Sequence, residues 1–166
     1  MNRVVTGYDE NGNAAIIRQG EPPTVIHAGR YVTTELWVTD AAPRLTDADT
    51  STREWALEPP HGGSCFRIVE IAPEGQEAPE GQEDDGGDAV GEGTLDGGHD
   101  DFQEAHATET LDYVTVLRGE VTLIVGGAEV TLGPGDSVVQ QPGVPHDWQN
   151  RSAERAIMVG VLLSAH

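Results

Sequence analysis

The chain has 166 residues, a length typical of one domain, and 37% of them are hydrophobic, which is enough for a single core. The formal net charge of −20 argues against nucleic acid or an anionic membrane as a partner, because both require a basic surface. Cys65 is the only cysteine, so no internal disulfide forms, and we expect it to be a small apolar core residue. The first residues lack a signal pattern and no apolar run could span a membrane, so we expect a cytoplasmic protein.

The first 71 residues predict short strands. The stretches "RVVTGY" at 3–8 and "AAIIRQ" at 14–19 flank an Asn-Gly pair that favours a hairpin turn. Three further stretches have the composition of strands, namely "TVIHAG", "ELWVTD" and "SCFRIVEI". The segment before the last of them, residues 42–63, is polar and irregular, and we predict one helical turn in it at Glu54–Leu57.

An acidic segment follows at residues 73–104. It holds 12 acidic residues, eight glycines and no Lys or Arg, and the hexapeptide "APEGQE" occurs twice in tandem at 72–83. Such a composition cannot bury a core, and it lacks the regularly spaced carboxylates of a calcium-binding loop. We therefore predict a mobile surface insertion. The remaining 17 acidic and nine basic residues give an ordinary net charge of −8.

The last third of the chain predicts a series of short strands. The candidates are 111–118, 120–125, 128–132, 136–141, 145–150 and 155–163, and Gly or Pro residues separate most of them. The sequence between them has no amphipathic helical pattern. Such a series is typical of an antiparallel sandwich or barrel, and a small barrel can hold a ligand inside.

Polar residues alternate at the start of this series. Because alternate side chains of a strand point to one face, His106, Thr108 and Asp112 share a face with Val114. Tyr113 points to the opposite face, and we expect it to pack in the core or at an interface. An imidazole and a carboxylate on the face that the valines use as interior predict a polar lumen.

The stretch 106–150 resembles the cupin superfamily, whose members are small β-barrels of jelly-roll type. The first cupin motif has two His separated by one residue, then a Glu, then six residues and a Gly. Here His106 is the first His, Thr108 replaces the second, Asp112 replaces the Glu, and Gly119 follows at the family spacing.

The second cupin motif runs Gly, five residues, Pro, one residue, Gly, two residues, His, three residues, Asn. This chain has Gly135, Gln141 in place of the Pro, Gly143, His146 and Asn150, so every spacing holds. Thr at the second His position and Asp-Tyr at the acid position are most similar to a group of small bacterial single-domain cupins.

The resemblance implies an all-β fold, a cupin-type jelly-roll β-barrel with an N-terminal strand extension. We expect one domain over 1–166, with N-terminal strands and loops at 1–71, the acidic insertion at 73–104 and the core cupin motifs at 105–163. It also implies a homodimer, because many cupins pair through their sheets. The expected partner is a small-molecule substrate, with neither nucleic acid nor a membrane.

The first functional hypothesis is an enzyme that transfers protons in the lumen and acts as a lyase or isomerase, by dehydration or decarboxylation of a small organic substrate. A His beside a carboxylate is held in one tautomer and exchanges protons near neutral pH. His106, Asp112 and His146 are therefore the predicted catalytic residues. The residues predicted to contact the substrate are Thr108, Trp148, Val114 and Val116.

Two alternatives stay open. In metal-binding cupins the two motifs supply three His and one Glu, and here His106, Asp112 and His146 remain, a two-His-one-carboxylate set for one divalent Fe, Mn, Zn or Ni ion. That set would suit a metal-dependent oxygenase. The second alternative is a non-catalytic barrel that binds a small ligand.

Overall fold

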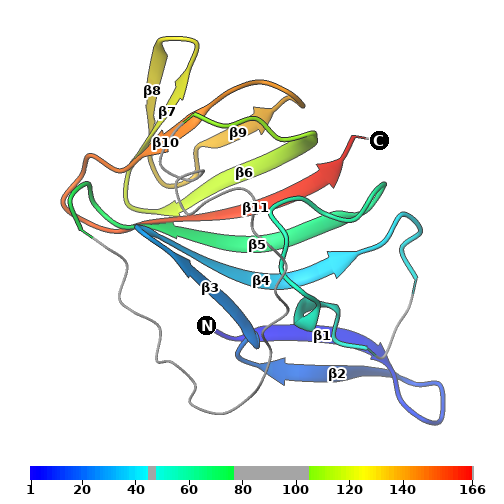
Figure 1. Ribbon diagram of the computed structural model, residues 1–166. Coiled ribbons are helices and arrows are strands. Elements are labelled where there is room, and N and C mark those ends of the chain that lie inside the picture. The colour runs from blue at the N-terminus through cyan, green and yellow to red at the C-terminus, as the bar shows by residue number, and fades with distance from the viewer. Residues whose placement is uncertain (45–47, 77–104, 166) are drawn as a thin grey trace.

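The computed structural model describes residues 1–44, 48–76 and 105–165, and the regular structure in these ranges is almost entirely β (Figure 1). The elements are β1 (Arg3–Tyr8), β2 (Ala14–Gly20), β3 (Thr24–Ala28), β4 (Tyr31–Thr39), the 3₁₀ helix η1 (Thr50–Thr52), β5 (Ser64–Ile71), β6 (Thr110–Arg118), β7 (Val121–Val125), β8 (Ala128–Leu132), β9 (Ser137–Gln140), β10 (Asp147–Gln149) and β11 (Ala156–Ser164). The predicted acidic insertion lies outside the described residues beyond position 76. Within the described ranges, no helix has the length and apolar character needed to cross a membrane.

Two antiparallel sheets enclose the interior, and a separate hairpin accompanies them. The larger sheet has the strand order β3-β4-β5-β11-β6-β9, and the smaller has the order β10-β7-β8. Figure 1 shows the larger sheet as a twisted fan across the centre, with the β7–β8 hairpin above it and the β1–β2 hairpin below. This architecture confirms the predicted all-β jelly-roll barrel.

Each predicted strand is present, and most of the strand ends agree within two residues. The main difference is β4, which begins at Tyr31 and not at Glu35. β4 pairs with β5, and β5 pairs with β11, so these N-terminal strands form part of the barrel wall itself.

The helical turn predicted at Glu54–Leu57 is wrong, and the turn occurs earlier, at η1. There the Asp49 side chain accepts a hydrogen bond from the Ser51 backbone N–H and caps the turn. The carbonyls of Ala56 and Leu57 instead accept hydrogen bonds from the guanidinium of Arg67. Tertiary bonds from β5 therefore replace the local bonds that a helical turn would need.

Apolar side chains fill one end of the barrel. The core cluster consists of Tyr31, Ile71, Val116, Val121, Leu123, Trp148, Ala156 and Met158. Cys65 is buried as predicted, and burial raises the pKa of its thiol to about 11. Of the two positions predicted for Tyr113, the core is excluded, because its side chain lies on the outer face of β6 and is 48% exposed, and an interface stays a prediction.

Two of the motif residues have structural roles. Gly119 has φ +72°, and a Cβ there would lie 2.7 Å from the Arg155 carbonyl oxygen, so the turn after β6 requires glycine. Asn150 is fully buried, and its amide nitrogen donates to the carbonyls of Ile71 and Glu154 at 2.8 and 2.7 Å. It thereby fixes the end of β10 to the end of β5, which holds the two sheets together near the site.

Candidate active site

His106 and His146 are direct neighbours across a β-bridge. The backbone N–H of each donates to the carbonyl oxygen of the other, with N···O distances of 3.0 and 2.9 Å. Their ring centroids lie 4.5 Å apart. The two motif regions, far apart in the sequence, are therefore joined at the predicted site.

The alternation at residues 106–112 places one side of the chain in the interior. Thr108 and Asp112 are buried, while Ala107 and Glu109 between and beside them are exposed. The Thr110 hydroxyl donates to Thr108 Oγ1 at 2.8 Å, so these two buried hydroxyl groups are hydrogen-bonded to each other. The polar face is thus the lumen face.

These side chains face a cavity of about 100 Å³. His106, Asp112 and His146 all line it, together with Thr108 and the apolar side chains of Val114 and Trp148. Val116, also predicted to contact the substrate, packs in the core at 1% exposure and is not part of the cavity wall. Val116 lies two residues beyond Val114 on the same face of β6, where the apolar core begins.

Gln140, at the end of β9, links His146 to Asp112. Its Nε2 lies 2.8 Å from His146 Nε2 and 3.5 Å from Asp112 Oδ2, while the Val144 carbonyl oxygen lies 3.0 Å from His146 Nδ1. An amide nitrogen only donates and a carbonyl oxygen only accepts, so this network assigns His146 as a neutral imidazole with its proton on Nδ1. Both ring nitrogens of His146 are therefore engaged within the protein.

Burial shifts the pKa of Asp112 and that of His146 in opposite directions. Desolvation raises the pKa of Asp112, against the smaller opposing effects of the nearby Thr110 hydroxyl and the Arg67 charge. Desolvation lowers the pKa of His146 and favours its neutral form. Asp112 Oδ1 is buried without a hydrogen-bond partner. A carboxyl group in this state is suited to accepting a proton from a bound molecule.

A buried ion pair that sequence reasoning missed borders the cavity. Arg67 Nη2 donates to Glu35 Oε2 at 2.8 Å, and both side chains are almost fully buried. The Arg67 guanidinium also lies 5.8 Å from the centroid of the Trp55 ring. Arg67 and Trp55 line the cavity, so the site has a cation and an aromatic wall in addition to the predicted groups.

Arg67, one member of this pair, could have been predicted from the sequence. In "SCFRIVEI", Arg67 has the same parity as the buried Cys65 and Ile71, which is the anomaly that identified His106. Gln140 likewise has the same parity as the partly buried Val138 on β9, so alternation places both on the inner face. Trp55 has no such signal, because it lies in an irregular segment whose path depends on tertiary contacts.

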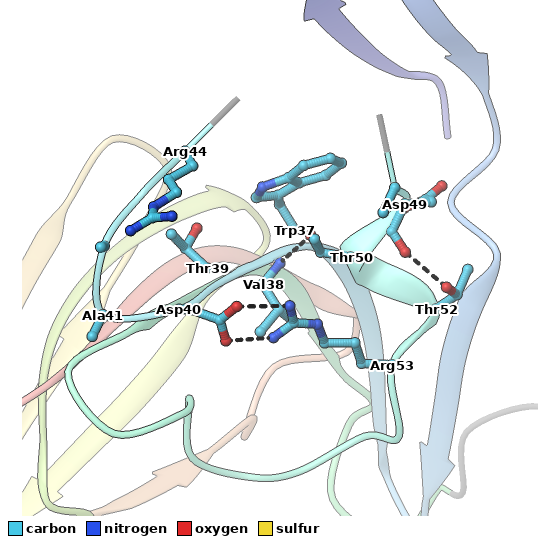
Figure 2. Close-up of a pocket in the computed structure, with 12 residues that line it drawn as sticks. Trp37, Val38, Thr39, Asp40, Ala41, Arg44, Asp49, Thr50, Thr52 and Arg53 are labelled. Atoms are coloured by element: carbon cyan, nitrogen blue, oxygen red, sulfur yellow. Dashed lines mark hydrogen bonds and ion pairs between the residues drawn. The ribbon is translucent and has the colours of Figure 1, made fainter. Parts of the chain in front are cut away.

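A larger hollow, of about 650 Å³, lies outside the barrel wall (Figure 2). Several of its polar groups pair with one another: Arg53 donates to both carboxylate oxygens of Asp40, at 2.7 and 2.9 Å, and the Val38 N–H donates to the Thr50 hydroxyl. The wall of this hollow contains none of the predicted catalytic residues. We therefore place the candidate site in the smaller cavity, which the predicted catalytic residues line.

Comparison with known proteins agrees with this geometry. Residues 91–162 match the family model described as a cupin domain, a range that contains both His106 and His146. These residues, which make up less than half of the chain, are therefore similar to a cupin domain. Two curated proteins are similar to this chain, the Phomopsin biosynthesis cluster proteins C' and D from Diaporthe leptostromiformis. Each is 27% identical over 165 residues, which cover 91% of this chain and 71% of the relative.

Solved structures show the same fold. A Cupin 2 conserved barrel domain protein from Salinispora arenicola superposes with a TM-score of 0.51 at 16% identity, over 92% of each chain. The polyketide cyclase RemF from Streptomyces resistomycificus gives a TM-score of 0.51 at 13% identity, over 89% of this chain and 79% of RemF. These likenesses concern the fold alone. Together with the cavity, the match to the cupin domain family supports a function on small molecules.

Metal-binding cupins raise the question of whether these residues fit a metal ion. Within residues 1–44, 48–76 and 105–165, no group of three or more His, Cys, Asp or Glu side chains is arranged to hold one. The Nε2 lone pair of His146 accepts from Gln140 and so is not directed to a shared metal position. Thr108 provides only a neutral hydroxyl, a weak ligand. As arranged, the predicted ligand set does not fit a metal.

Proposed function

We propose that this protein is a small-molecule enzyme that transfers protons without a metal, with a lyase or isomerase outcome such as dehydration or decarboxylation. The observation that carries this proposal is Asp112, a buried carboxyl with one unpartnered oxygen, which lines the same cavity as two imidazoles. Carboxyl and imidazole groups of perturbed pKa in a cavity are the usual equipment of acid–base catalysis.

In this mechanism Asp112 Oδ1 accepts a proton from a substrate carbon next to a carbonyl group. Asp112 becomes neutral, the form that its buried surroundings favour. An imidazolium at His106 then donates a proton to the leaving oxygen, which departs as water, or to another carbon, which completes an isomerisation. We assign this role to His106 because its ring lines the cavity and lies 4.5 Å from the ring of His146. Gln140 and His146 act by orienting Asp112.

The relatives support a role of this kind. The curated proteins that resemble this chain are named for a biosynthesis cluster, which fits an enzyme that makes a small molecule. The likeness to a cyclase is one of fold, and it fits a barrel whose lumen accommodates an organic substrate.

We expect substoichiometric transition metal in protein purified without chelator, since His146 Nε2 is engaged by Gln140. Elemental analysis measures this, and mass spectrometry of compounds released on denaturation supplies candidate substrates. Stoichiometric metal, with turnover lost to chelator and restored by the metal, would contradict the metal-free mechanism. A released compound that the enzyme returns unchanged would indicate a binding protein.

We also propose a homodimer through the outer face of the larger sheet. Phe66, Val161, Tyr113 and Val139 lie in direct cross-strand register there, and three of them are 42–59% exposed. A second copy packed on this uncharged row would cover it. Light scattering is expected to show a dimer that Tyr113→Glu dissociates, while Val130→Glu, at an exposed site on β8, leaves it intact. A wild-type monomer at micromolar concentration would refute this.

A further inference from the structure

A second chamber lies next to the catalytic cavity, on the other side of Trp55. Its volume is about 260 Å³, and Trp55 lines both spaces. The irregular segment 53–60 forms one wall, and β4 and β5 form the other. We call it the Glu35 chamber, and it is lined by Glu35, Val38, Trp55, Pro59, Pro60 and Cys65, among others.

Glu35 provides this chamber with an unpartnered buried oxygen. The side chain is only 3% exposed, and its Oε2 accepts from Arg67 at 2.8 Å. Oε1 is buried without any hydrogen-bond partner. A buried carboxylate oxygen that lacks a donor costs free energy, so native proteins normally supply one from water or a ligand. The chamber therefore favours a molecule that brings a donor group to Oε1.

The charges around the chamber favour a cationic donor. Glu54 and Glu58 line it in addition to Glu35. Arg53 also lines it, but both terminal nitrogens of its guanidinium donate to the Asp40 carboxylate, as Figure 2 shows. Arg67 likewise balances Glu35, so the exposed carboxylates of Glu54 and Glu58 provide the excess of negative charge around the space, and the remaining wall is apolar.

We propose that the Glu35 chamber binds a primary amine at the end of a short apolar chain. The ammonium group donates to Glu35 Oε1, and the chain packs against Trp55, Pro59 and Pro60. The amine site stands on its own geometry. That this amine is one end of the substrate whose other end reacts at Asp112 rests on the proposed function. Trp55, which lines both spaces, would then set the distance between the amine and the reacting atom.

The test uses full-length protein with ¹⁵N-labelled tryptophan, whose three indole N–H signals are assigned by single Trp→Phe variants. The probes are n-butylammonium, n-butanol and butyrate, which match in length and differ in charge. We expect n-butylammonium to shift the Trp55 signal saturably, more tightly than n-butanol, with Trp37 unmoved and butyrate inactive. Equal binding of the three probes, or a preference for butyrate, would overturn the proposal.

Glu35→Gln is expected to weaken n-butylammonium binding about tenfold or more, because it removes the charge from the hydrogen bond. Glu54→Gln, an exposed carboxylate of the same chamber, is the matched control and should change binding less than about threefold. If Glu35→Gln does not fold, the double variant Glu35→Gln/Arg67→Met removes both charges of the pair and takes its place. Unchanged affinity in the folded variant contradicts the proposal.

The amine site and the proton-transfer mechanism fail separately. Asp112→Asn is expected to keep n-butylammonium binding while it loses turnover. If Asp112→Asn loses turnover but the wild type does not bind n-butylammonium, only the proposed amine site in the Glu35 chamber is refuted. Amine binding with full turnover in Asp112→Asn supports the chamber and refutes the catalytic site.

Discussion

Asp112→Asn is expected to lower turnover about 10²–10⁴-fold, the usual contribution of a positioned acid–base group. Asparagine keeps the shape of the side chain but cannot accept a proton at Oδ1. The fold should survive, because the raised pKa of Asp112 means that its ionised form is unfavourable in the folded protein. The wild type has its full unfolding free energy while Asp112 is protonated. It loses part of that free energy as pH rises past the usual carboxyl range and Asp112 ionises, whereas the variant does not. Its unfolding free energy at pH 7 is therefore equal or higher.

Single-turnover rates and denaturant unfolding, measured on the same preparations, check this result. Glu120→Gln removes a carboxylate from an exposed position after β6 and serves as the control with unchanged rates. The wild-type rate should also fall with acid around a pKa above the usual Asp value, since the base form is required. Full turnover in both Asp112→Asn and His146→Ala would refute the site, whichever mechanism operates.

Arg67→Met is expected to destabilise the protein by about 3–5 kcal/mol, because it leaves the Glu35 carboxylate buried without its partner. The variant also loses the hydrogen bonds to the carbonyls of Ala56 and Leu57, so the segment that carries Trp55 should loosen. Desolvation already raises the pKa of Glu35 against the pull of Arg67. Without Arg67 the pKa rises further, and the stability loss is largest at high pH and shrinks as acid protonates Glu35.

Denaturant unfolding from pH 4 to 8 measures this dependence. The double variant Arg67→Met/Glu35→Gln should recover much of the loss, since no unpaired charge remains. Arg53→Met breaks an exposed pair with Asp40 and should have a much smaller effect, because water screens that pair. A loss in Arg67→Met no larger than in Arg53→Met would show that the buried pair does not hold this segment.

The sequence predicted the strands and the polar lumen face because both depend on local alternation. The motif spacing also brought His106 and His146 together correctly, since that spacing reflects the register between two paired regions. The pattern could place Val114 and Val116 on one face, but it could not tell cavity from core. That distinction depends on how far the opposite sheet extends, which alternation along one strand does not encode.

The missed residues belong to long-range contacts. Glu35 and Arg67 meet because β4 and β5 pair in a particular register, and Trp55 joins them only through the fold of an irregular segment. Gln140 reaches His146 across a turn that also had to be placed first. A search for charged residues with the parity of buried neighbours would have found Arg67.

β11 lies between β5 and β6 in the larger sheet, although it follows both in the sequence. During synthesis on the ribosome, Arg67 on β5 and Asp112 on β6 emerge before the strand that joins them. Until β11 inserts, β5 and β6 each have an unpaired edge towards the position that β11 will occupy. The nascent chain therefore exposes two strands able to pair with other chains. The candidate cavity is therefore among the last features to form, and a chain interrupted before residue 156 would hold most of the candidate site residues yet have no assembled site.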